Sequence, residues 1–100
     1  MVSIDNIIER AKTYLPDLNE ERVRRAFRFA DAAHAGQTRF SGEPYIIHPL
    51  GVTMLLLDFH PDEDLIIAAL LHDVAEDTAK TLDDIEEAFG HEVRVLCWGV

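Results

Sequence analysis

This sequence has a single cysteine, no apolar run of bilayer length and few basic residues in its second half. Cys97 is its single cysteine, so no internal disulfide is possible and a reducing, cytoplasmic location is expected. No apolar run approaches the roughly 18 residues that span a bilayer, and the amino terminus has no signal-like segment, so we expect no membrane partner. Residues 40–100 contain two bases, Lys80 and Arg94, against thirteen acids, which excludes a general nucleic-acid-binding surface. An acidic half of this kind suits either cation binding or simple solubility.

The 100 residues are 48% apolar and 28% charged, which indicates one globular domain. Apolar residues recur with helical spacing nearly throughout, and no strand pattern is convincing, so the sequence predicts an all-α fold. The first helix is expected over 3–15 and the second from the N-cap Asn19 to near Gly36. A Gly- and Pro-containing loop covers 36–44. Four further helices are expected, from Tyr45 or Pro49 to about Asp58, from Asp62 or Asp64 through 65–71, from Thr81 to Gly90, and from about Glu92.

The fourth expected helix carries the most informative conflict in the sequence. Residues 65–71 are apolar on every side of the helix, which predicts a central, buried position. The next residues are His72 and Asp73, followed by Glu76 and Asp77. On a continuous helix His72, Asp73 and Glu76 share one side. Buried carboxylates are costly unless they are paired, so a divalent cation would resolve the conflict, whereas a helix end emerging into solvent would remove it.

Other candidate residues are weaker when each is taken alone. His48 precedes Pro49 and, by itself, is more typical of a packed or capping histidine than of a metal ligand. His34 is expected to end the second helix, and His60 and His91 are expected at the surface. The loop residues Arg39, Ser41 and Gly42 offer a guanidinium and backbone donors for an anion, or form an ordinary connection.

Taken together, these segments resemble the hydrolase domain of the RelA/SpoT homologue family, within the HD phosphohydrolase superfamily. The resemblance covers about residues 20–100, and Phe89-Gly90 also matches. Its specific parts are AHAGQTR (33–39), SGEPYIIHPL (41–50) and AALLHDVAEDT (68–78). It implies an orthogonal multi-helix HD-domain bundle, of which this chain is the amino-terminal portion.

The resemblance also implies an activity, namely manganese-dependent removal of the 3′-pyrophosphate from guanosine tetra- and pentaphosphate, the alarmones of the stringent response. The implied partner is therefore a guanine nucleotide, and the implied cofactor is Mn2+. Transferred position by position, the metal ligands are His48, His72 and Asp73, and the acidic pair that positions and activates water is Glu76 and Asp77. The implied substrate-binding residues are Arg39, Ser41, Gly42 and Tyr45.

Two departures from the family pattern shape the expectations for this chain. Phe40 stands where many relatives carry Lys, and the family's fourth metal ligand is an Asp on a later helix than any in residues 1–100. We therefore expect residues 1–100 alone to be a poor hydrolase with weak metal binding. We also expect self-association through apolar surface left uncovered on the fourth helix.

Two alternatives remain at this point. One is a non-catalytic nucleotide-sensing or interaction fragment of a RelA/SpoT-type protein. The other is a generic HD nucleotide phosphohydrolase, against which the segment from Arg39 to His48 argues.

Overall fold

Helices account for nearly all the regular structure of the computed structural model, which describes residues 2–98. Within these residues the only strand-type pairing is an isolated bridge between Thr38 and Pro44, so the all-α prediction is confirmed. None of the described helices is long and apolar enough to cross a membrane. The elements are α1 (Ile4–Lys12), α2 (Glu20–Ala33), α3 (Ile47–Leu56), the 3-10 turn η1 (Leu57–Phe59), α4 (Glu63–Leu71), α5 (Val74–Asp77), α6 (Leu82–Phe89) and α7 (His91–Trp98).

The helix starts follow the capping residues of the sequence. Asn19 accepts a hydrogen bond from the backbone of Arg22, and Asp62 accepts one from Leu65. Thr81 and Asp84 form a reciprocal capping box at the start of α6. These side chains satisfy backbone N–H groups that have no partner in the first turn of a helix, which is why the predicted starts are confirmed.

Helix ends were less predictable. The first helix ends at Lys12 rather than at residue 15, and α2 ends at Ala33 with His34 as its C-cap. Two starts also differ from the predicted ones, because the third helix begins at Ile47, between the two predicted starts, and the last begins at His91.

The predictions that His60 and His91 lie at the surface are confirmed.

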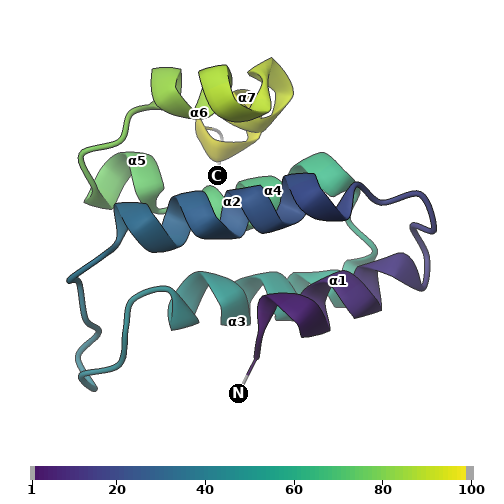
Figure 1. Ribbon diagram of the computed structural model, residues 1–100, viewed down its shortest axis with the longest axis horizontal. Helices are drawn as coiled ribbons and strands as arrows, with labels where there is room; N and C mark the ends of the chain where they lie inside the picture. The colour runs from purple at the N-terminus through teal and green to yellow at the C-terminus, as the bar shows by residue number, and fades with distance from the viewer. Residues whose placement is uncertain (1, 99–100) are drawn as a thin grey trace.

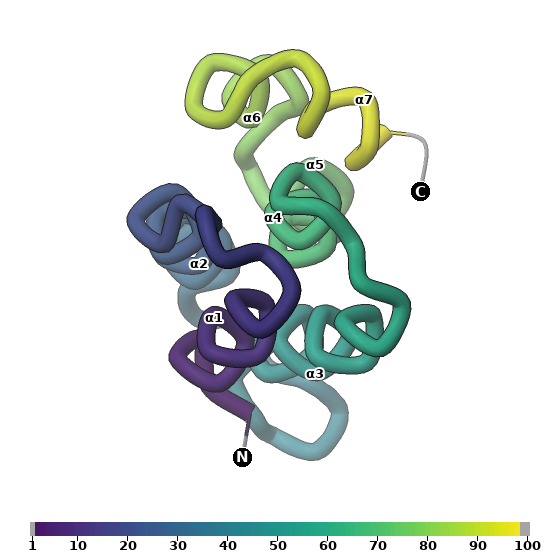
Figure 2. Tube along the Cα trace, turned by 90° about the vertical axis from the view of Figure 1, so that its right-hand side faces the viewer, coloured from purple at the N-terminus to yellow at the C-terminus, as the bar shows by residue number. Residues whose placement is uncertain are grey.

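The helix α4 lies in the middle of the fold beside α2, with α1 and α3 on one side of these two helices and the pair α6–α7 on the other (Figures 1 and 2). It contacts α2, α3 and α7 directly. Residues 66–71 are all buried, with Ile66, Leu70 and Leu71 completely so. The prediction of a central, buried helix is confirmed.

The position of the uncovered apolar surface corrects the sequence-based expectation. That surface does not lie on α4, because α2, α3 and α7 cover it. Large exposed apolar side chains instead lie on α3 and η1, where Leu55 is 71% and Phe59 is 82% exposed, and on α7, where Trp98 is 76% exposed. Self-association through apolar surface stays a prediction, with these helices as its location.

Two glycines provide a matched test of backbone strain. Gly90 caps α6 with a φ of 101°, whereas Gly51 lies inside α3 at ordinary helical angles, and a Cβ would meet no atom within 4 Å at either position. We expect Gly90→Ala to destabilise the fold by about 1–3 kcal/mol because the added side chain disfavours this backbone conformation. Gly51→Ala should stabilise it by about 0.5–1 kcal/mol because alanine loses less entropy in a helix. Urea unfolding of both variants measures the change in the free energy of unfolding, and equal effects of the same sign would contradict the assigned backbone strain at Gly90.

Candidate metal centre

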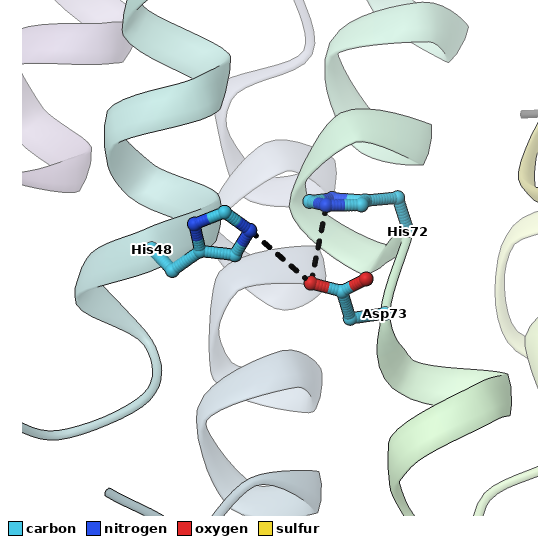
Figure 3. A group of neighbouring side chains, drawn as sticks. All are labelled: His48, His72 and Asp73. Atoms are coloured by element: carbon cyan, nitrogen blue, oxygen red, sulfur yellow. Dashed lines mark ion pairs between the residues drawn. The ribbon is translucent and has the colours of Figure 1, made fainter. Parts of the chain in front are cut away.

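Three side chains from different elements converge beside the carboxyl end of α4. His48 lies in the first turn of α3, where the following proline is tolerated, while His72 caps α4 and Asp73 precedes α5 (Figure 3). The Nε2 atoms of His72 and His48 lie 3.1 and 3.4 Å from the same carboxylate oxygen, Asp73 Oδ2. One ligand atom from each residue lies within 4.8 Å of the others. Packing of α3 against α4 therefore brings together residues 24 and 25 positions apart in the sequence.

The ring of His72 is oriented by its own helix. Its Nδ1 lies 2.6 Å from the carbonyl oxygen of Ala69, and a carbonyl can only accept, so Nδ1 carries the proton. The other ring nitrogen, Nε2, faces the cluster and lies 3.1 Å from Asp73 Oδ2. A ring N–H held by a carbonyl is the usual arrangement behind a metal-ligating histidine.

The donor set fits a divalent transition metal. Two imidazole nitrogens and one carboxylate oxygen suit manganese, zinc or iron, and the set itself does not choose among them. The side chains of His72 and Asp73 are each 18% exposed and that of His48 is 32% exposed, so the cluster is reachable from solvent but partly desolvated. The three residues predicted as ligands are thus brought together, and their role in binding a metal stays a prediction.

Tyr45 connects the cluster to one residue of the acidic pair. Its hydroxyl donates to Asp73 Oδ2 at 2.9 Å and reaches Asp77 Oδ2 at 3.3 Å. Burial raises the pKa of Tyr45, and the hydrogen bond to Asp73 and the charges of both aspartates raise it further. The phenol therefore stays protonated and remains a donor. Tyr45, predicted to bind substrate, is in this structure a hydrogen-bond partner of the cluster.

The expectation that the fourth helix continues through residues 72–77 is wrong. The chain turns at His72 and Asp73, and the short helix α5 starts afresh at Val74. Glu76 is exposed and, among the described residues, is not one of the three that form the cluster. The inference that Glu76 shares a helix face with His72 and Asp73 therefore fails, because the turn changes the direction of the backbone between them.

The loop 36–44 forms a tight turn next to the cluster. Arg39 and Gly42 are joined by a backbone hydrogen bond of 2.8 Å, with Gly42 at a φ of 86°, and the Arg39 N–H donates to the carbonyl of Glu43. A pocket of about 330 Å³ lies beside it, lined by Thr38, Arg39, Phe40, Tyr45 and His48. Arg39 thus shares a pocket with a member of the cluster. Ser41 and Gly42 are exposed at the turn and do not line this pocket.

Phe40 also borders the pocket, and its side chain is fully exposed. An aromatic ring therefore borders the pocket at the position where lysine is expected in many relatives. The pocket retains one basic side chain, Arg39, within its lining.

His34 and Gln37 are the residues near the site whose importance the sequence did not show. His34 is 2% exposed, and its ring stacks on that of Tyr45 at 4.5 Å between centroids. Gln37 donates through Nε2 to the carbonyl of Asp77 at 2.8 Å. The available signal was the matched segment AHAGQTR itself, in which a histidine and a glutamine precede the loop.

Comparison with known proteins places this geometry in a family. The family described as "HD domain" matches residues 26–100, a region that contains all three residues of the cluster. The chain belongs to the HD domain family. The prediction of an HD-domain bundle is therefore confirmed.

Relatives of this HD domain belong to the RelA/SpoT group. The chain is 45% identical over all its 100 residues to the bifunctional (p)ppGpp synthase/hydrolase SpoT of Escherichia coli strain K12, and equally to a guanosine-3′,5′-bis(diphosphate) 3′-pyrophosphohydrolase of Shigella flexneri. It is 44% identical over 94 residues to the GTP pyrophosphokinase rsh of Brucella ovis. The resemblance to the RelA/SpoT homologue family is confirmed. The HD-domain chain spans about 14% of the length of the first two relatives and 12% of the third.

Proposed function

We propose that this chain is the amino-terminal part of a metal-dependent hydrolase domain that removes the 3′-pyrophosphate from guanosine tetra- and pentaphosphate. The observation that carries the proposal is the convergence of His48, His72 and Asp73 beside the pocket that holds Arg39. The printed names of two relatives, a (p)ppGpp synthase/hydrolase and a 3′-pyrophosphohydrolase, support the choice of substrate.

The proposed chemistry is hydrolysis of a phosphate ester. Water attacks the phosphorus attached to the ribose O3′, the bond between that phosphorus and O3′ breaks, and O3′ takes up a proton as pyrophosphate leaves. A divalent ion, when bound by the three residues, supplies the Lewis acidity that activates water and offsets phosphate charge. Manganese is the ion that the family resemblance favours.

The proposed roles of the chain's own residues are phosphate binding, orientation of water and positioning of Asp73. Arg39, which lies just before the acidic residues 40–100, offers a guanidinium to phosphate oxygens in this pocket. Asp77 and Glu76 are both exposed, and Asp77, which lies within reach of the Tyr45 hydroxyl, is the better placed of the acidic pair to orient water. The Tyr45 hydroxyl donates the hydrogen bond that holds Asp73 Oδ2.

A turnover assay tests this proposal. Guanosine tetraphosphate is incubated with Mn2+ and either residues 1–100 or a longer protein that carries this chain and the fourth ligand of the family. We expect manganese-dependent pyrophosphate release from the longer protein and little from residues 1–100, because three ligands hold a metal less tightly than four. Metal binding without turnover in the longer protein would favour the nucleotide-sensing alternative. Release from other nucleotides at the same rate would favour a generic phosphohydrolase.

A further inference from the structure

A connected set of hydrogen bonds and ring stacking joins the end of α2 to Asp73. Apart from Asp73 itself, its members do not belong to the three-residue cluster. It begins at His34, which is 2% exposed and whose Nδ1 lies 3.3 Å from Gln37 Oε1. Because the amide oxygen only accepts, Nδ1 carries the proton in this contact. Within the described residues, the buried Nε2 has no hydrogen-bond partner.

Two routes lead onward from His34. The first is the face of its ring, which stacks on Tyr45 with an interplanar angle of 26°, and the Tyr45 hydroxyl donates to Asp73. The second is Gln37, whose amide nitrogen donates to the backbone carbonyl of Asp77 at the end of α5. The backbone of Gln37 adds a further tie, since its carbonyl accepts from the Tyr45 N–H at 3.1 Å. Both the phenol and α5 are therefore held against the end of α2.

We propose that His34 and Gln37 are positioning residues that fix the Tyr45 ring and α5, so that the Tyr45 hydroxyl holds Asp73 Oδ2 toward His48 and His72. The inference rests on the proposed function only in treating Asp73 as a metal ligand. The side-chain hydrogen bonds and the ring stacking of these two residues join them to each other, to Tyr45 and to the backbone of Asp77, so each acts through Tyr45 or through α5.

Simple packing does not account for a histidine at this position. A buried imidazole with one unpaired nitrogen stabilises a core less than an apolar side chain of similar volume, since the nitrogen loses its hydrogen bonds to water. What an apolar side chain would not provide is a donor that holds the Gln37 amide. That amide in turn fixes the end of α5, which carries Asp77.

The first test measures Asp73 without any metal. The side-chain carboxyl 13C resonance of Asp73 is recorded at one pH in the full chain and in the variants Tyr45→Phe, His34→Leu and Gln37→Leu. Tyr45→Phe removes only the hydroxyl and so defines the resonance of an Asp73 that has lost this donor. We expect both leucine variants to move the resonance toward that value. A resonance unchanged from the parent chain in either folded variant would overturn the role of that residue.

The second test measures Mn2+ affinity by the electron paramagnetic resonance of the free ion. Loss of a residue that orients a ligand typically weakens metal binding about 10–100-fold, and we expect this for both leucine variants. Asn19→Ala is the matched control, because it removes the cap of α2 at the end far from Tyr45. It should lower the melting temperature and leave Mn2+ affinity unchanged, whereas a fall in affinity that simply follows stability in all three variants would overturn the inference.

The two tests separate this inference from the proposed function. Absence of Mn2+ binding by the longer protein would contradict the proposed function, and the Asp73 resonance would still decide the inference. If His34→Leu fails to fold, Gln37→Leu carries both measurements, because Gln37 lies in the partly exposed turn after α2.

Discussion

Replacing Asp73 with alanine is expected to abolish manganese-dependent hydrolysis of guanosine tetraphosphate by the longer protein and to weaken Mn2+ binding by more than about 100-fold. The reason is that Asp73 Oδ2 is the atom on which both histidine Nε2 atoms converge. Removing it takes away one ligand and the only negative charge of the cluster. Mutating a residue that only orients a ligand already weakens metal binding about 10–100-fold, so the loss of a ligand itself should have a larger effect. Pyrophosphate release and calorimetric titration with Mn2+ provide the two measurements.

Asp83→Ala is the matched control for this experiment. Asp83 is also an aspartate, its side chain is 84% exposed, and its ion pair with Arg94 lies on α6 and α7. It should leave both hydrolysis and Mn2+ affinity within about twofold of the parent, since a surface ion pair contributes only about 0–1 kcal/mol to stability. Hydrolysis that survives in Asp73→Ala, with metal content verified, would rule out the proposed centre.

The largest effect on stability is expected from shortening a buried side chain of α4. Ile66 is completely buried on the helix that contacts α2, α3 and α7, so alanine there leaves a cavity that neighbouring layers cannot easily fill. We expect Ile66→Ala to lower the free energy of unfolding by about 2–5 kcal/mol, a large part of the roughly 5–15 kcal/mol that holds a domain folded. Urea denaturation followed by circular dichroism measures the change.

Leu55→Ala removes a similar volume from an exposed site. Its side chain is 71% exposed on α3, and we expect a change within about 0.5 kcal/mol. A loss at Leu55 equal to that at Ile66 would mean that the α3 surface is covered in solution, which would in turn support the predicted self-association.

The sequence was most informative where a single side chain decides a local structure. Asn19, Asp62 and the Thr81–Asp84 pair each satisfy backbone donors within three residues, so their effects can be predicted without knowing the rest of the fold. The apolar residues 65–71 likewise predicted a buried helix whatever the neighbouring helices were, and residues 66–71 are buried.

The geometry of the site was less predictable because it depends on contacts between distant segments. Helical spacing suggested that Glu76 would lie beside His72 and Asp73, but the chain turns at those two residues and α5 begins after them. The sequence also placed His34 only at a helix end. Its burial arises from packing against Tyr45, which is 11 positions away and belongs to the segment after the loop.

The turn at His72 and Asp73 limits which substitutions the region tolerates for reasons unrelated to ligand chemistry. His72 and Asp73 already have right-handed helical backbone angles, so continuing α4 through this turn would mainly rotate the residues that follow, and it would move the Asp77 carboxylate relative to the Tyr45 hydroxyl. The turn therefore sets the position of α5, and with it that of Asp77, as well as ending α4. Helix-favouring changes near positions 72–74, usually regarded as conservative, are therefore expected to displace α5 and to weaken its contacts with Tyr45 and Gln37.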